Sequence, residues 1–117
     1  MPYLQEITNS KPMYTEISDV PAREILPGYH ARFLHGEGYT LAFWDVEAGA
    51  VLPEHAHVHE QAAQVLEGRF ELVVEGETFV CGPGAVVRIP SNARHSGLAL
   101  TDCKLMDVFT PVREDYK

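Results

Sequence analysis

Turn signals divide the chain into short segments, and their spacing is the feature that most limits its possible folds. Glu67-Gly68 and Glu75-Gly76 separate runs rich in β-branched and aromatic residues, and Gly82-Pro83-Gly84 makes a further break. No helical period persists for three turns anywhere in the sequence. Short strands at intervals of about 8–12 residues are typical of a β-sandwich or barrel. The sequence therefore predicts an all-β fold.

The expected strands lie between these turns. Because strand side chains alternate between two faces, Ala42, Trp44 and Val46 should share one face of the first strand. The candidate core residues are Trp44, Phe70, Leu72 and Val74. The expected strands cover residues 39–46, 64–66, 69–74, 78–80, 85–89, 96–100 and 104–110. Upstream, Tyr14–Ile17 could form a short pairing strand at a sheet edge or a contact with another subunit.

Composition excludes some partners. The length of 117 residues suits one domain, and 45% hydrophobic residues is enough to build a core. A net charge of −8 argues against nucleic acid, whose phosphates require a basic surface. No apolar run is long enough to span a membrane. We therefore expect neither nucleic acid nor a membrane as a partner.

Cysteine usage and the first residues bear on the compartment. Met1–Ser10 lacks the basic start and apolar stretch of a secretory signal. Without export, Cys81 and Cys103 are expected to be reduced core residues rather than a disulfide. The sequence thus predicts a cytoplasmic protein.

Histidines indicate a metal site. His55 and His57 stand at i and i+2, which places both imidazoles on one face if the segment is extended. Gln61 and His95 could complete a set of three imidazole nitrogens and one oxygen. These donors predict one divalent transition metal, and they suit Ni, Zn, Fe, Co or Mn. His59 is expected to line the pocket rather than to bind the metal.

The histidines sit inside a longer pattern that resembles the cupin superfamily. Gly49, five residues, His55-x-His57, three residues, Gln61, six residues and Gly68 resemble the first cupin motif. Gly84, five residues, Pro90-x-Asn92, two residues and His95 resemble the second. The resemblance implies a single-domain, jelly-roll-like β-barrel that holds a metal inside.

Three residues depart from the cupin pattern, and one of them is Ala99, which replaces the customary asparagine. Gln61 stands where the family usually has glutamate, which leaves the bound metal its full charge and favours polarising a substrate over activating dioxygen. Asn92 stands where glycine is usual, and asparagine tolerates the left-handed backbone that such a turn can require.

The resemblance also suggests how the chain is organised. The barrel would cover residues 31–113, preceded by an N-terminal segment over residues 1–30 and followed by a tail over residues 114–117. Cupin barrels commonly pair through edge strands, so a homodimer is expected, with the N-terminal segment as a possible source of contact strands.

The end of the chain resembles a narrower family. Asp107-Val-Phe109-Thr-Pro-Val-Arg113 is similar to the tail of KdgF-type cupins of pectin and alginate breakdown. The resemblance implies conversion of 4,5-unsaturated monouronates to the linear keto form. It assigns Asp107 to proton transfer, Phe109 to packing against the sugar and Arg113 to the uronate carboxylate. Asp107, Phe109 and Arg113 are expected to alternate along one strand.

Two other functions fit the same residues. One is a cupin dioxygenase that uses the same ligands to hold Fe(II), and the other is a non-enzymatic module that binds sugar or metal. The sequence also does not separate pectin-derived from alginate-derived substrates.

Overall fold

The computed structural model describes residues 11–117, which form two antiparallel β-sheets and two short 3₁₀ helices. The helices are η2 (Ile17–Asp19) and η3 (Glu114–Tyr116). The strands are β1 (Arg23–Leu26), β2 (Tyr29–His35), β3 (Thr40–Val46), β4 (Val51–His55), β5 (Glu60–Glu67), β6 (Phe70–Val74), β7 (Glu77–Cys81), β8 (Val86–Ile89), β9 (His95–Ala99) and β10 (Cys103–Thr110). The prediction of an all-β, jelly-roll-like barrel is confirmed.

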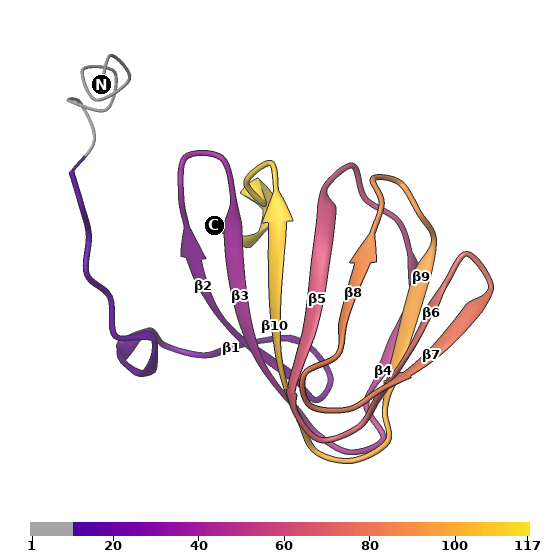
Figure 1. The fold of residues 1–117 in the computed structure, drawn as a ribbon. Helices are drawn as coiled ribbons and strands as arrows, with labels where there is room; N and C mark the ends of the chain where they lie inside the picture. Colours follow the sequence, from indigo (N-terminus) through magenta and orange to yellow (C-terminus); the bar gives the residue numbers. More distant parts are fainter. Residues whose placement is uncertain (1–10) are drawn as a thin grey trace.

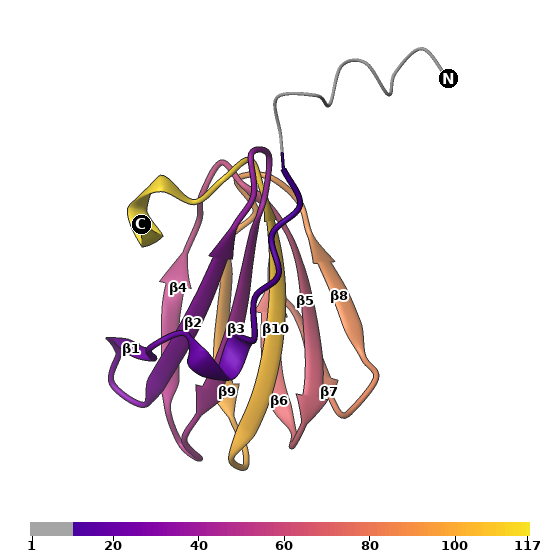
Figure 2. The ribbon, with the colours of Figure 1, turned by 90° about the vertical axis from the view of Figure 1, so that its left-hand side faces the viewer.

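The two sheets lie face to face around the core. One has six strands in the order β1-β2-β3-β10-β5-β8, and the other has four in the order β4-β9-β6-β7 (Figure 1). In Figure 2 the six-stranded sheet lies in front of the four-stranded one, and η3 sits at the upper end of the barrel. The C-terminal strand β10 pairs with both β3 and β5, so the end of the chain lies in the middle of the larger sheet.

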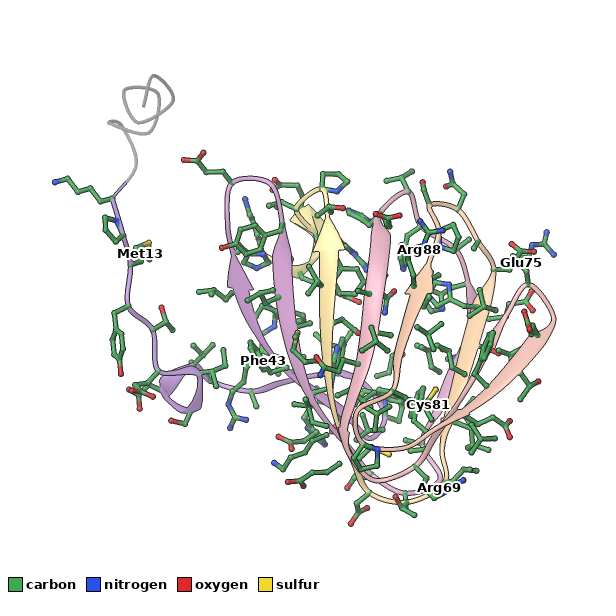
Figure 3. The ribbon with its side chains drawn as sticks, in the orientation of Figure 1. Met13, Phe43, Arg69, Glu75, Cys81 and Arg88 are labelled. Atoms are coloured by element: carbon green, nitrogen blue, oxygen red, sulfur yellow. The ribbon has the colours of Figure 1, made fainter. Side chains whose placement is uncertain are left out.

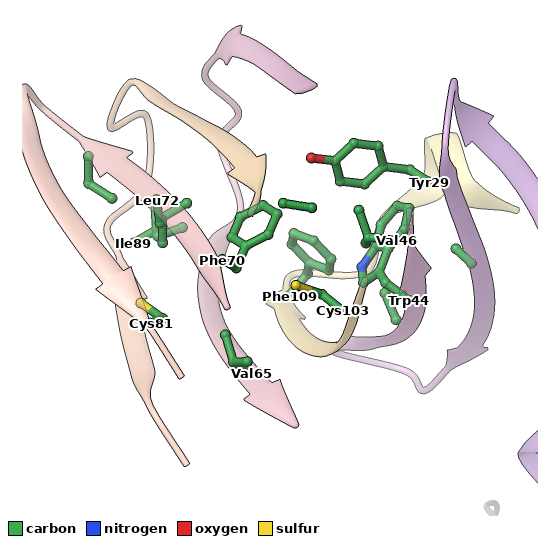
Figure 4. Close-up of a cluster of buried hydrophobic side chains, with 14 of the residues drawn as sticks. Tyr29, Trp44, Val46, Val65, Phe70, Leu72, Cys81, Ile89, Cys103 and Phe109 are labelled. Carbon is green, nitrogen blue, oxygen red and sulfur yellow. The ribbon is translucent and has the colours of Figure 1, made fainter. Parts of the chain in front are cut away.

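Alternation of side chains builds the core from both sheets. On β3 the buried positions alternate with half-buried ones, so that Ala42, Trp44 and Val46 point inward as expected. Phe70, Leu72 and Val74 of β6 are buried opposite them, which confirms the predicted core (Figure 4).

Each of the strands expected between residues 39 and 110 is present, with shifted ends. The largest difference is β5, which extends the expected residues 64–66 to Glu60–Glu67. Gln61, Ala62 and Ala63 have low β propensity, but they pair with β10 on one side and β8 on the other. Pairing on both edges therefore decides the conformation of this segment. Strands β1 and β2 were not among the expected strands.

The described part of the N-terminal segment differs from expectation. Tyr14–Ile17 forms no strand: Tyr14 is exposed and Ile17 begins η2. Figure 3 places Met13 on this arm, away from the barrel, and its side chain is exposed. Residues 1–10 lie outside the described residues, and the homodimer stays a prediction. Within residues 11–117, no helix is long and apolar enough to cross a membrane.

Gly68 offers a direct test of how tightly the β5–β6 turn is packed. Its φ is +86°, and a Cβ there would lie 2.2 Å from the carbonyl oxygen of Asp102. We expect Gly68→Ala to lower the free energy of unfolding by about 3 kcal/mol, since both the backbone conformation and the contact are unfavourable. Urea denaturation measures the change.

Gly49→Ala is the matched control for the Gly68 substitution. Gly49 has a φ of +85°, but a Cβ there would meet no atom within 4 Å. Only the cost of the left-handed backbone remains, about 1 kcal/mol. If the two variants lose the same free energy of unfolding, the contact with Asp102 does not contribute to the cost of Gly68→Ala.

Candidate metal centre

Three histidines come together where the two motifs meet. His55 ends β4 and His95 begins β9, and the two are paired directly across the sheet. His57 lies in the link between β4 and β5. The strand that was expected to carry both histidines stops at His55, so His57 lies beyond it. Their imidazoles still converge: the ring centroids of His57 and His95 are 4.9 Å apart, and those of His55 and His95 are 4.1 Å apart.

The turn of the second motif holds the link that carries His57. The backbone N–H of Asn92 donates to the carbonyl of His57 at 2.8 Å, and the Ser91 hydroxyl donates to the carbonyl of Val58. Asn92 has a φ of 64°, which confirms that this position needs the left-handed conformation that asparagine tolerates. The turn thus replaces the strand as the support for His57.

Each of the three imidazoles is fixed by a backbone carbonyl. The Nδ1 of His55 pairs with Pro53 O at 2.9 Å, that of His57 with His59 O at 3.0 Å, and that of His95 with Ala93 O at 2.9 Å. A carbonyl only accepts, so each Nδ1 carries the proton and donates it. In the neutral ring Nε2 then carries no proton, and a ring nitrogen without a proton can bind a metal.

The Nε2 atoms make this cluster suitable for a metal ion. Those of His57 and His95 are buried, and within residues 11–117 neither has a hydrogen-bond partner. One ligand atom from each of His55, His57 and His95 lies within 4.8 Å of the others. Buried polar atoms without a partner are costly, and a shared cation would satisfy them. These three histidines could therefore hold a metal ion.

Burial and nearby charges keep the imidazoles of His57 and His95 neutral. Burial, Arg113 and His95 lower the pKa of His57 to about 4. Burial is also the main cause that lowers the pKa of His95. Near neutral pH both rings are thus neutral, with the proton on Nδ1, so a metal does not have to displace a proton from Nε2.

Gln61 lies beside the cluster on β5, buried and paired with Phe109 of β10. Its side chain hydrogen-bonds with the carboxyl of Asp107. When Asp107 is ionised, only the amide N–H₂ of Gln61 can donate to it, which leaves the amide oxygen for another partner. Asp107 thereby sets which end of Gln61 is available.

Asp107 is a buried carboxyl inside the barrel. Trp44 Nε1 donates to its Oδ2 at 2.9 Å. Burial raises the pKa of Asp107 to about 7, although Gln61, Trp44 and Arg113 oppose the rise. A carboxyl with this pKa is populated in both protonation states near neutral pH, so it can give and take a proton.

Phe109 and Arg113 lie close to the histidines but on different parts of the backbone. Phe109 shares the inner face of β10 with Asp107, as expected, and its ring centroid is 5.7 Å from that of His57. Arg113 follows the end of β10 at Thr110, so the expectation that it continues the same strand is wrong. Its backbone N–H donates to Thr40 Oγ1 at 2.9 Å, and its side chain is buried over the Phe109 ring.

The cavity next to His95 is mostly apolar. Its polar lining includes Gln61, Gln64, His95 and Asp107, while Leu72 and Phe70 are among the apolar side chains that line the rest. A concave apolar site with a few convergent polar groups is typical of small-molecule binding.

Other residues singled out in the sequence lie as follows. His59 lies next to His57, with its ring 5.5 Å from that of His57 and a buried Nδ1. Cys81 and Cys103 are buried and unpaired, as expected.

The family scan matches the cupin domain over residues 42–109, more than half of the chain. The chain belongs to the cupin family. This cupin is 36% identical over 70 residues to the pectin degradation protein KdgF of Dickeya dadantii, and the match covers 58% of this chain and 64% of that relative. The chain thus spans less than two thirds of that protein's length.

Solved structures extend the likeness to almost the whole chain. The structure of KdgF from Halomonas sp. superposes with a TM-score of 0.87 at 26% identity, covering 92% of this chain and all of the other. An RmlC-like cupin from Shewanella frigidimarina superposes with a TM-score of 0.86 at 26% identity, covering 92% and 97%.

Sequence reasoning missed three residues of this site. Trp44 was assigned only to the core, although a buried indole N–H usually finds an acceptor, and that acceptor is Asp107. Asp115 and Tyr116 lie in η3 and contact Arg113, although residues 114–117 were expected to be only a tail. No periodic pattern marks so short a helix.

The pKa of Asp107 leads to a prediction about stability. An acid whose pKa is higher in the folded than in the unfolded state stabilises the fold when protonated, and this contribution is lost as pH rises through the folded-state pKa. Here the window runs from the ordinary value of 3.8 to about 7. Asp107→Asn cannot ionise. We compare the free energy of unfolding of the variant with that of the unmodified protein. The difference, variant minus unmodified, should therefore rise by about 2 to 3 kcal/mol between about pH 5 and pH 8.

Urea denaturation of chelator-treated protein at both pH values measures this difference, because the chelator removes the contribution of bound metal. The histidines titrate in both proteins and their contribution cancels in the comparison. A difference that does not change with pH would contradict a raised pKa for Asp107.

Proposed function

We propose that this cupin is a metal-dependent enzyme that converts 4,5-unsaturated monouronates to their linear keto form. The observation that carries the proposal is the buried carboxyl of Asp107, hydrogen-bonded to Gln61 beside the cluster of His55, His57 and His95. In this cluster the buried Nε2 atoms of His57 and His95 have no hydrogen-bond partner within residues 11–117. The likeness to a pectin degradation protein supports the same substrate class.

His55, His57 and His95 would hold the metal through Nε2, and the amide oxygen of Gln61 would be the fourth ligand. When bound there, a divalent transition metal supplies Lewis acidity toward the oxygen atoms of the substrate. Gln61 contributes no charge, so its role is to complete the ligand set while Asp107 holds its N–H₂ group.

Asp107 is the proton-transfer group. Opening the ring requires a proton to be added at C4 of the C4=C5 double bond and another to be lost from the anomeric hydroxyl. As the C1–O5 bond breaks, its electrons complete the C5 keto group, while C1 becomes the aldehyde. One proton enters and one leaves, so a single carboxyl can perform both transfers and no oxidant is needed.

Phe109 and Arg113 provide the binding surfaces. Phe109 lies between the histidines and Arg113, where its ring can pack against the sugar. Arg113 carries a buried positive charge in a protein of net charge −8, and its guanidinium suits a carboxylate geometrically. It would bind the uronate carboxylate.

The test is turnover of 4,5-unsaturated monogalacturonate by metal-loaded protein, followed as loss of the enol-ether ultraviolet absorbance. We expect a rate above the spontaneous reaction that disappears on chelation. Asp107→Asn should lower kcat by about 10²–10⁴-fold because it can no longer transfer a proton, with the bound metal retained.

Asp45→Asn is the matched control for the Asp107 variant. It makes the same chemical change on a half-buried carboxylate that pairs with Lys104 and Arg32, outside the site, and should keep the activity. A rate equal to buffer with metal bound would contradict the proposed reaction. If the protein loaded with Fe(II) consumes oxygen and does not open the uronate, it is a dioxygenase. If it binds the uronate without turnover, it is a binding module.

A further inference from the structure

Asp115 makes a two-point contact with the guanidinium of Arg113. Nε donates to Oδ1 at 3.0 Å and Nη2 donates to Oδ2 at 2.8 Å, the geometry of a bidentate pair. Within residues 11–117, no other carboxylate lies within ion-pair distance of Arg113. The Arg113 side chain is 8% exposed and that of Asp115 is 57% exposed. A surface carboxylate therefore fixes one edge of a buried cation.

Two aromatic rings fix the guanidinium from other directions. Its central carbon lies 4.7 Å from the centroid of Phe109 and 4.1 Å from that of Tyr116. Tyr116 is itself stacked on Phe33 of β2, with the centroids 4.5 Å apart. The helix η3 thus supplies both a carboxylate and a ring that determine how Arg113 is oriented.

The pair with Asp115 leaves part of the guanidinium for a ligand. Of the five N–H donors of arginine, Asp115 engages one on Nε and one on Nη2, and Nη1 takes part in neither bond. The guanidinium also donates a hydrogen bond to the Tyr116 side chain, and the remaining donors are left for a ligand. The charge of Arg113 still acts at the centre of the site, since it lowers the pKa of His57.

We propose that Asp115 is a positioning residue that holds Arg113 in the orientation needed to bind the carboxylate of an acid sugar. This inference rests on the proposed function, in which Arg113 binds the uronate. Asp115 itself does not touch the substrate. The opposite possibility is that Asp115 competes with the substrate carboxylate for Arg113.

The two possibilities differ in the sign of their effect. Removing the charge of Asp115 leaves Arg113 more positive, so electrostatics alone would make an anion bind more tightly. If Asp115 competes with the substrate, its removal also tightens binding. Weaker binding of the acid sugar after removal of Asp115 can therefore come only from lost positioning.

The variants are Asp115→Asn and, as a matched control, Glu114→Gln. Each replaces a carboxylate of η3 by its amide, but Glu114 pairs with Lys117 and not with Arg113. In metal-loaded protein we expect Asp115→Asn to raise both KM for the unsaturated uronate and Kd for galacturonate by about tenfold, with kcat within about threefold. Glu114→Gln should leave all three unchanged.

A second measurement does not depend on turnover. The Nε–H signal of Arg113 in the NMR spectrum, assigned by its loss in Arg113→Lys, should exchange slowly with water in the unmodified protein and in Glu114→Gln. It should exchange much faster in Asp115→Asn, because the hydrogen bond to Oδ1 is lost or weakened.

The inference requires both the weaker galacturonate binding and the faster exchange, and the absence of either overturns it. A lower KM or Kd in Asp115→Asn would show that Asp115 competes with the substrate. If the unmodified protein binds galacturonate but does not open the unsaturated uronate, the proposed reaction fails while the binding and exchange data still decide the role of Asp115.

Discussion

The hydrogen bonds from Nδ1 of His55, His57 and His95 to backbone carbonyls are the constraint on which the site depends. They set the tautomer of each ring and direct Nε2 toward a shared centre. The cost is that the buried Nε2 atoms of His57 and His95 have no partner within the described residues. The fold supports this arrangement from two sides, through the β4–β9 pairing and through the Asn92 turn.

A second consequence follows from the position of β10 between β3 and β5. This order brings Trp44 and Gln61 to the two sides of Asp107, so that one buried carboxyl links the core to the proposed ligand set. The same strand carries Phe109 toward Arg113. Because burial opposes ionisation of Asp107 while its neighbours favour it, the carboxyl is held near the point where it can exchange a proton.

Local patterns in the sequence predicted the fold class and the convergence of the three histidines. Turn residues and alternation indicated the strands, and motif spacing indicated the cluster. The sequence did not predict the support of His57 by the turn at Asn92, because a strand was assumed to continue past His55. It also missed the contacts of Asp115 and Tyr116 with Arg113, which depend on how η3 folds back over the end of the barrel. Such contacts are long-range or lie in short irregular segments, where no sequence period exists.

X-ray absorption spectroscopy of the metal-loaded protein tests the central claim most directly, because it identifies and counts the atoms bound to the metal. The account predicts three imidazole nitrogens and an oxygen donor, and two imidazoles in His95→Ala. A metal bound by fewer than three imidazoles in the unmodified protein, or by sulfur, would contradict the assignment of His55, His57 and His95 as its ligands.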